Sequence, residues 1–368
     1  MKGGAETPIV SLASILYMVS LGYGGIQKLR WMLYGKNILK SRRLPCKVVS
    51  IGNIAVGGTG KTPMTIYVAN RIKALGYTVA VLSRGYKGEA EKKGALVSDK
   101  KTIFLGPEIA GDEPFMLACR LEGIPVIVGR DRFAAGMLAV QHFRPDVVVL
   151  DDGFQHLRLA RDMDFVLLDY IQPFGNSHLL PRGMLREPIA SLSRSDACIL
   201  TRTKMDSSSA SGSAVDRLQT VVPQCPVFSS FHTPYYYTIP AATKAPFDRL
   251  SKQPCADDFN FLTGRSVMAF SGIARNDDFR QTIEALNCIK TGFLEFPDHH
   301  RYSEKDISII TQAAKKATAE ILVTTEKDYA RIAADTVWPL DLVVIGVRIS
   351  FGEEEQRFDD FLKQGLVD

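Results

Sequence analysis

Residues 52–63 form a glycine-rich segment that ends in lysine, threonine and proline and follows an apolar run. Its glycines leave backbone N–H groups free to converge on phosphate oxygens. Lys61 adds a positive charge, and the Thr62 hydroxyl can hold Mg²⁺. This spacing predicts a loop that binds a nucleoside triphosphate. The residues expected around its phosphates are Val56, Gly57, Gly58, Thr59, Gly60, Lys61 and Thr62.

The match to the general phosphate-loop pattern is a variant, because the pattern has glycine five positions before Gly60 and this chain has Ala55. The surroundings compensate for that difference. An apolar β-branched run at residues 46–51 precedes the loop, and residues 64–72 after Pro63 show helical spacing of apolar side chains. Strand, loop and helix therefore occur in the order that a phosphate loop requires.

Two adjacent carboxylates, Asp151 and Asp152, end the apolar run 146–150. Enzymes with a phosphate loop place an acid at the end of such a strand to hold Mg²⁺. One of the two is therefore expected to face a metal that Thr62 also contacts, and the sequence leaves open which one. A pair of acids at a strand end can also simply cap the next turn.

A further carboxylate, Asp112, stands between Gly111 and Glu113-Pro114. Proline is favoured near helix starts and acids suit the positive end of a helix, so this motif predicts a helix N-terminus. Capping alone would explain Asp112. Beside a phosphate site, it is also a candidate to accept a proton from an attacking hydroxyl.

Two histidines, His299 and His300, follow Asp298 just beyond the apolar run 292–296. Histidine can orient or tune a catalytic carboxylate at neutral pH. A metal site is disfavoured here because no third ligand stands at a suitable spacing. The sequence does not decide between the two histidines.

One segment keeps a different nucleotide open. Residues 203–206 read Thr-Lys-Met-Asp after an apolar run and resemble the guanine-reading N-K-x-D pattern, with threonine for asparagine. A GTPase would also have D-x-x-G after its acidic strand, whereas here Gly153 comes one residue too early. A P-loop GTPase or metallochaperone-type switch protein therefore remains the alternative, with Lys204 and Asp206 as its base-reading residues.

The composition fits a soluble globular protein that fills two domains. The chain has 368 residues, of which 46% are hydrophobic and 23% charged. Its six cysteines contain no C-x-x-C pair, which argues against a zinc ribbon or a disulfide framework and is typical of a reducing compartment.

Apolar β-rich runs alternate with helical patterns along most of the chain, which predicts an α/β fold with a doubly wound parallel sheet like that of P-loop NTPases. The pattern breaks at residues 231–262 and a second alternating region follows. We therefore expect four parts: an N-terminal helix at 1–43, a P-loop kinase core at 44–230, a strand linker at 231–262 and a smaller C-terminal α/β domain at 263–368.

The positive charge of the chain is concentrated near its start. Residues 1–50 hold eight Lys/Arg and one acidic residue, whereas the whole chain carries a net charge of +5. An uncharged, largely apolar run at 7–27 precedes most of these cations. Anionic lipids attract such juxtamembrane cations, so we expect a membrane-associated helix that lies in the interface, peripheral or monotopic. The alternative is an amphipathic helix docked on its own domain.

In this order, several motifs together resemble the tetraacyldisaccharide 4'-kinase family, the lipid A 4'-kinases of Gram-negative bacteria. The resemblance covers nearly the whole chain, and its fourth and fifth motifs are the most distinctive. The motifs are Gly57-Gly58-Thr59-Gly60-Lys61-Thr62-Pro63, Ser83-Arg84-Gly85-Tyr86, Gly111-Asp112-Glu113-Pro114, Asp151-Asp152-Gly153-Phe154-Gln155-His156, Pro181-Arg182-Gly183-Met184-Leu185-Arg186-Glu187-Pro188, Asp298-His299 and Thr325-Glu326-Lys327-Asp328.

The resemblance implies a kinase that uses ATP and Mg²⁺ to phosphorylate the 4'-hydroxyl of an acylated glucosamine disaccharide 1-phosphate. It implies Asp112 as the catalytic base assisted by His299, with Lys61 holding phosphates. Thr62, Asp151, Asp152 and Glu187 would form the Mg²⁺ neighbourhood. It also implies a place on the cytoplasmic face of the bacterial inner membrane, with membrane lipids as partners.

Two more hypotheses belong to other classes. A nucleic-acid-stimulated ATPase would use the basic N-terminal segment for phosphates, with a steep salt dependence. A membrane scaffold would bind nucleotide without turnover. Because the apolar run precedes the basic cluster, we expect lipid and no nucleic acid as partner, and no obligate protein partner is inferred.

Overall fold

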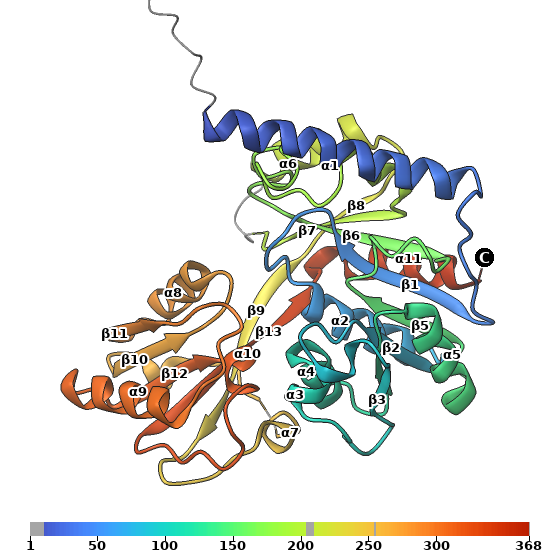
Figure 1. Ribbon diagram of the computed structural model, residues 1–368. Coiled ribbons are helices and arrows are strands. Elements are labelled where there is room, and N and C mark those ends of the chain that lie inside the picture. Colours follow the sequence, from blue (N-terminus) through green and yellow to red (C-terminus); the bar gives the residue numbers. More distant parts are fainter. Residues whose placement is uncertain (1–10, 204–209, 254, 368) are drawn as a thin grey trace, which may run out of the picture.

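The computed structural model describes residues 11–203, 210–253 and 255–367. Within them the strands form two sheets (Figure 1). The eight-stranded sheet comprises, in spatial order, β3 (Ala95–Ser98), β4 (Val126–Val128), β2 (Val79–Ser83), β5 (Val147–Asp151), β1 (Lys47–Asn53), β6 (Met163–Asp169), β7 (Ala197–Thr201) and β8 (Val227–Ser229). The five-stranded sheet comprises β11 (Ile289–Glu295), β10 (Ser266–Ser271), β12 (Ile321–Thr325), β13 (Asp341–Ser350) and β9 (Phe231–Ile239).

Both sheets are parallel except at one edge. In the larger sheet β3 runs antiparallel to β4, and in the smaller sheet β9 runs antiparallel to β13. The central strand β1 pairs with β5 on one side and β6 on the other. Parallel strands are buried on both faces and read as continuous apolar runs, which is why these strands were predictable.

Helices cover both faces of the larger sheet, so the doubly wound fold class is confirmed. One core joins the sheet to α2, α4 and α11, and cores on the opposite face join it to α5 and α6. The helices are α1 (Leu12–Gly35), α2 (Lys61–Ala74), α3 (Pro107–Ala110), α4 (Asp112–Arg120), α5 (Arg132–Phe143), α6 (Ala210–Val221), α7 (Phe247–Leu250), α8 (Asn276–Ala285), α9 (Glu304–Lys316), α10 (Glu326–Tyr329) and α11 (Glu355–Val367).

The chain passes twice between the large lobe, which is built on the eight-stranded sheet, and the small lobe, which is built on the five-stranded sheet. β9 enters the smaller sheet and β13 leaves it, and Figure 1 shows this pair of strands between the lobes. After β13 the chain returns to the large lobe, where Phe358 and Leu362 of α11 pack in the core beneath β1 and β6. The expected division of the chain differs from this arrangement at two places. Residues 231–239 are a strand of the smaller sheet, and α11 is built into the larger lobe.

The long helix α1 lies along the outer side of the large lobe (Figure 1). One side of it is fixed to the loop that precedes the short 3₁₀ helix η2 (Ile189–Arg194). Ser20 Oγ lies 2.9 Å from the Leu179 carbonyl oxygen, and Tyr23 Oη donates to the Arg186 carbonyl oxygen at 2.8 Å. Its other side exposes large apolar residues: Leu12, Ile15, Met18, Val19, Leu21, Ile26, Leu29 and Met32. No helix in the described part of the chain is both long and apolar enough to cross a bilayer.

Candidate active site

The glycine-rich loop follows β1 at the carboxyl edge of the larger sheet and runs into α2. Gly60, the residue before α2, has φ of 81°, in the left-handed region. A Cβ at Gly60 would lie 2.9 Å from His232 Nε2, closer than real Cβ atoms pack. Glycine is therefore required here both by backbone conformation and by space.

Contacts on both sides hold the loop in shape. The Val56 N–H donates to the Met184 carbonyl oxygen at 2.7 Å, and Asn53 Nδ2 donates to Thr59 Oγ1 at 2.9 Å. Arg202, which follows β7, donates to the Gly58 carbonyl oxygen. The remaining loop N–H groups and the N-terminus of α2 make an anion site of the kind that binds phosphates.

Asp152 interacts with two cations at the wall of this site. Lys61 Nζ lies 3.8 Å from Asp152 Oδ1, and Arg186 Nη1 donates to Asp152 Oδ2 at 2.9 Å. Burial raises the pKa of Asp152, but the charges of Lys61 and Arg186 outweigh it and hold that pKa below its usual range. The φ of Asp152 is 53°, an unusual value for a residue with a side chain. Such local strain concentrates at functional sites.

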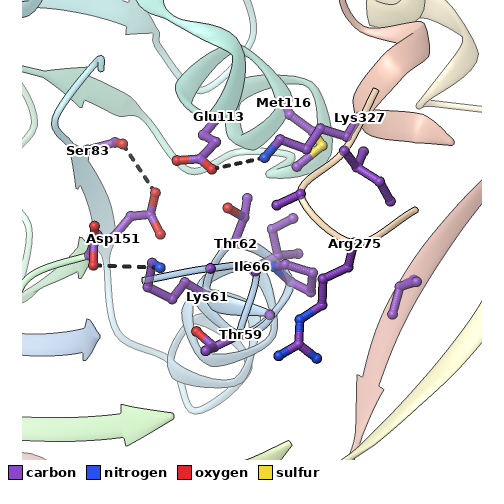
Figure 2. Close-up of a pocket in the computed structure, with 18 of the residues that line it drawn as sticks. Thr59, Lys61, Thr62, Ile66, Ser83, Glu113, Met116, Asp151, Arg275 and Lys327 are labelled. Atoms are coloured by element: carbon purple, nitrogen blue, oxygen red, sulfur yellow. Dashed lines mark hydrogen bonds and ion pairs between the residues drawn. The ribbon is translucent and has the colours of Figure 1, made fainter. Parts of the chain in front are cut away.

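Asp151 lies in an environment rich in negative charge. It is buried, and it accepts a hydrogen bond from Thr65 Oγ1 at 3.1 Å. A second one comes from Ser83 Oγ at 3.2 Å (Figure 2). Burial and the charges of Glu113 and Asp152 raise the pKa of Asp151 to about 7. Carboxylates crowded in this way repel one another unless a cation lies between them.

The residues present fit a magnesium ion. Figure 2 shows Thr62, Asp151 and Glu113 around the same space. No group of three or more His, Cys, Asp or Glu in the described residues has the arrangement of a complete metal cage. Mg²⁺ does not need one, because it is commonly held by one or two carboxylates, substrate phosphates and water. Glu113 is a site residue that the sequence interpretation did not single out.

Glu187 occupies a different setting. It is buried, and its Oε2 accepts a hydrogen bond from Arg194 Nη2 at 2.6 Å. The Arg194 guanidinium in turn lies over the Phe154 ring, 4.4 Å from its centroid. Glu187 therefore lies in a buried ion pair with Arg194 and is not among the residues that line the cavity.

Asp112 and His299 come from different lobes and meet. Asp112 is the first residue of α4, as the helix-start motif predicts, and its Oδ2 lies 3.0 Å from His299 Nδ1. Arg331 Nε donates to the same oxygen at 2.8 Å. Burial raises the pKa of Asp112, but the hydrogen bond from His299 and the charge of Arg331 lower it below its usual value. Asp112 is therefore ionised at neutral pH.

The neighbouring histidine has other contacts. His300 Nε2 lies 3.2 Å from Asp306 Oδ2, and the His300 ring stacks on Phe296 at 4.7 Å between centroids. His299, by contrast, lines the cavity that holds the phosphate loop. Of the two histidines, His299 is the one in contact with Asp112.

Two further arginines join the lobes beside the phosphate loop. Asp169, at the end of β6, accepts from Arg202 Nη1 at 3.0 Å and from Arg275 Nη1 of the small lobe at 2.8 Å. Across the cavity, Lys327 Nζ lies 3.4 Å from Glu113 Oε1 and joins the lobes a second time. Sequence reasoning did not identify Arg202 or Arg275. The one signal in the sequence that could have identified Arg202 is its position directly after the apolar run 197–201, which is β7.

The phosphate loop and several of these side chains line one cavity of about 2080 Å³ between the lobes, whereas Asp112 and Glu187 are not among its lining residues. Its wall includes the phosphate loop, Asp151, Glu113, His299 and Arg275. Thr203 also lines it, while Lys204 and Asp206, the expected base-reading residues of a GTPase, lie outside the described residues. A phosphate loop, crowded carboxylates and a cavity-lining histidine in contact with a carboxylate define a phosphotransferase of the P-loop class.

Comparison with known proteins identifies the family. The model of the family described as "Tetraacyldisaccharide-1-P 4'-kinase" matches residues 12–366, and the chain belongs to that family. It is accordingly a kinase of lipid A biosynthesis that uses ATP and Mg²⁺.

Relatives match over nearly their whole length. The tetraacyldisaccharide 4'-kinase of Desulfatibacillum aliphaticivorans is 41% identical over 367 residues, covering 100% of this chain and 96% of the relative. That of Syntrophus aciditrophicus is 41% identical over 327 residues, covering 87% and 84%. The crystal structure of LpxK from Aquifex aeolicus in complex with ATP is 30% identical, with a TM-score of 0.72, covering 97% of this chain and 100% of that one.

Proposed function

We propose that the chain transfers the γ-phosphoryl group of ATP to the 4'-hydroxyl of tetraacyldisaccharide 1-phosphate, with Asp112 and His299 handling the proton of that hydroxyl. The observation that carries the proposal is their 3.0 Å contact across the lobes, beside the phosphate loop. The names and coverage of the relatives support the same acceptor.

The binding roles follow from charge and position. The N–H groups of residues 57–62 would hold the β- and γ-phosphates, and Lys61 would neutralise charge that develops on them. Thr62 and Asp151 would hold Mg²⁺, which neutralises phosphate charge when bound, with Glu113 and Asp152 completing the negative surroundings. Glu187 would act through Arg194 and the loop that carries Arg186, because its own carboxylate is paired.

The acid–base role falls to the residue pair at the lobe interface. Asp112 Oδ2 is taken by His299 and Arg331, which fix the carboxylate while its low pKa keeps it ionised. As the acceptor oxygen bonds to the γ-phosphorus and the bond to the β-phosphate oxygen breaks, the hydroxyl proton passes to the pair, and ADP leaves. Closed lobes would also exclude water, which competes as an acceptor.

We further propose that α1 seats the enzyme on the cytoplasmic face of the bacterial inner membrane. Leu12, Met18 and Ile26 are 72%, 67% and 65% exposed, on a helix whose other side is fixed by Ser20 and Tyr23. Cations follow on the same helix and just beyond it, which suits anionic lipid. Such a helix would present the lipid acceptor to the cavity without crossing the bilayer.

The reaction is tested by phosphate transfer from ATP to tetraacyldisaccharide 1-phosphate in detergent micelles. The wild type should form the product and Lys61→Ala should not, while both remain folded by circular dichroism. GTP in place of ATP tests the switch-protein alternative. If the wild type binds nucleotide but forms no product, the kinase assignment is rejected, and only the nucleotide-binding role of the phosphate loop is retained.

The membrane proposal has its own test, liposome flotation with anionic vesicles. Leu12→Ser, Met18→Ser and Ile26→Ser together should release the protein from the vesicles. A matched control carries serine at Ile289, Ile309 and Val337, which are exposed apolar residues of the small lobe. Equal flotation of both variants would show that α1 is not the membrane-binding element.

A further inference from the structure

Two cysteines that take no part in the cavity meet at the opposite edge of the larger sheet. Cys198 lies at the start of β7, and Cys225 lies just before β8. Their sulfur atoms are 3.7 Å apart. Because β7 and β8 are parallel to β1, this edge carries the amino ends of the strands, whereas the phosphate loop lies at their carboxyl ends.

The backbone around the pair is held in place. The Cys198 N–H donates to the Pro226 carbonyl oxygen at 3.0 Å, and Cys198 is in register with Val227 of the neighbouring strand. Ser195 Oγ lies 3.4 Å from Cys225 Sγ and 3.7 Å from Cys198 Sγ. The pairing of β7 with β8 therefore holds the two thiols next to each other.

The two sulfurs differ in access and in acidity. Cys198 is fully buried, whereas Cys225 is partly exposed. The hydrogen bond between the two thiols lowers the pKa of Cys225 to about 7, against burial and with help from Ser195. The same hydrogen bond, together with burial, raises the pKa of Cys198 above its usual range. Cys225 thus has the properties of an attacking thiolate, and Cys198, with its sulfur 3.7 Å away, is placed to resolve the oxidised form of Cys225.

We propose that Cys225 and Cys198 are a peroxide-sensitive thiol pair that closes a reversible disulfide. In the first step the Cys225 thiolate attacks a hydroperoxide oxygen, the O–O bond breaks, and Cys225 becomes a sulfenic acid as the peroxide is reduced to water. In the second step Cys198 Sγ attacks Cys225 Sγ, its proton leaves with the hydroxyl as water, and the S–S bond forms. Together, two thiols and one hydrogen peroxide give a disulfide and two waters.

The geometry permits the second step with little movement. A disulfide needs its sulfurs about 2.05 Å apart, and these two are already in van der Waals contact between adjacent strand ends. In a reducing compartment the bond would be transient and opened again by thiol exchange. Because the pair lies away from the cavity, this inference does not depend on the proposed kinase activity.

The test is thiol mapping by mass spectrometry of the full-length protein after titration with hydrogen peroxide and alkylation. We expect a peptide pair joined through Cys198 and Cys225, which disappears after dithiothreitol. Cys46 is the internal reference, because it is also partly exposed, but burial and the charges of Asp162 and Asp146 raise its pKa to about 11. Cys225 should be consumed at least tenfold faster than Cys46.

Two variants test which of the two cysteines is oxidised first. Cys198→Ser should accumulate a Cys225 sulfenic acid that dimedone traps, whereas Cys225→Ser should give no dimedone adduct at buried Cys198. Cys288→Ser, outside the pair, should behave as the wild type. Absence of the joined peptide in the oxidised wild type, or dimedone labelling of Cys225 no faster than of Cys46, would overturn the proposal without recourse to any variant.

Discussion

The Asp112 carboxylate of the large lobe and the His299 imidazole of the small lobe lie 3.0 Å apart. Neither residue can make this contact within its own lobe. Arg331, also from the small lobe, donates to the same carboxylate oxygen. The residue pair therefore exists only where the two lobes meet.

Replacement of Gly60 by alanine should weaken nucleotide binding by more than tenfold. Alanine at position 60 would have to adopt a left-handed backbone conformation, which costs about 1–2 kcal/mol. Its Cβ would also clash with His232 Nε2. Gly58→Ala is the matched control in the same loop, since a Cβ there has only Arg202 at 3.9 Å. Titration of both variants with a fluorescent ATP analogue should show the larger loss for Gly60→Ala. The reverse order would contradict this description of the loop.

Removal of Arg275 should loosen closure of the lobes. Its ion pair with Asp169 is partly exposed, so its contribution is limited to about 1 kcal/mol, equivalent to roughly a fivefold loss of kcat/KM for ATP. The measurement is steady-state kinetics of Arg275→Ala beside Arg280→Ala. Arg280 pairs with Glu295 inside the small lobe, so its loss should leave kcat/KM unchanged. Equal effects would show that the interlobe contact is unimportant.

Glu113→Gln should raise the Mg²⁺ concentration needed for half-maximal activity severalfold, because a carboxylate beside Asp151 loses its charge. Glu113 also pairs with Lys327 across the cavity, so Lys327→Met is the control that removes this ion pair and keeps the carboxylate. Activity measured against Mg²⁺, after metal removal with EDTA, separates the two roles. A larger Mg²⁺ requirement in Lys327→Met would assign the effect to the ion pair.

His232 should make the protein less stable in mild acid. Burial and the charge of Arg202 lower its pKa to about 4, below the value of roughly 6.5 of an unfolded chain. The neutral form is therefore favoured by folding, and that stability is present above pH 6.5 and lost as the pH falls toward 4. The slope from one such histidine reaches about 1.4 kcal/mol per pH unit.

Urea denaturation at several pH values measures this slope. His232→Gln should reduce it, while His156, whose pKa burial likewise lowers to about 4, keeps its own contribution. Exposed His142 provides the control, and His142→Gln should change nothing. A wild-type slope in His232→Gln would show that His232 does not couple folding to protons.

The strands of both sheets were predictable because buried parallel strands are continuous apolar runs. The run at 46–51 became β1, and that at 146–150 became β5. The short edge strands β3 and β8 were not predicted, since each ends in serine and neither is a run of β-branched residues like β4. The packing of α11 on the large lobe depends on tertiary contacts that no local pattern expresses.

The site residues that belong to local sequence motifs were predictable. The phosphate loop, the pair of acids and the Asp112 helix start all follow from local motifs. Arg275 and Lys327 were not found, because each gains its partner only where the lobes meet. Arg202 pairs with Asp169 inside the large lobe, and that contact depends on the order of strands in the sheet. For Glu187, the burial of its carboxylate against Arg194 could not be read from its motif.

The most direct test of the account is the single-turnover rate of phosphate transfer in Asp112→Asn, His299→Gln and the double variant, with ATP saturating. If the two residues act as one unit, each single change should cost about 10²–10⁴-fold, and the double variant should be no more than about tenfold slower than the worse single one. Losses that multiply, or a near wild-type rate for Asp112→Asn, would contradict the claim that the lobes close to assemble one proton-accepting pair.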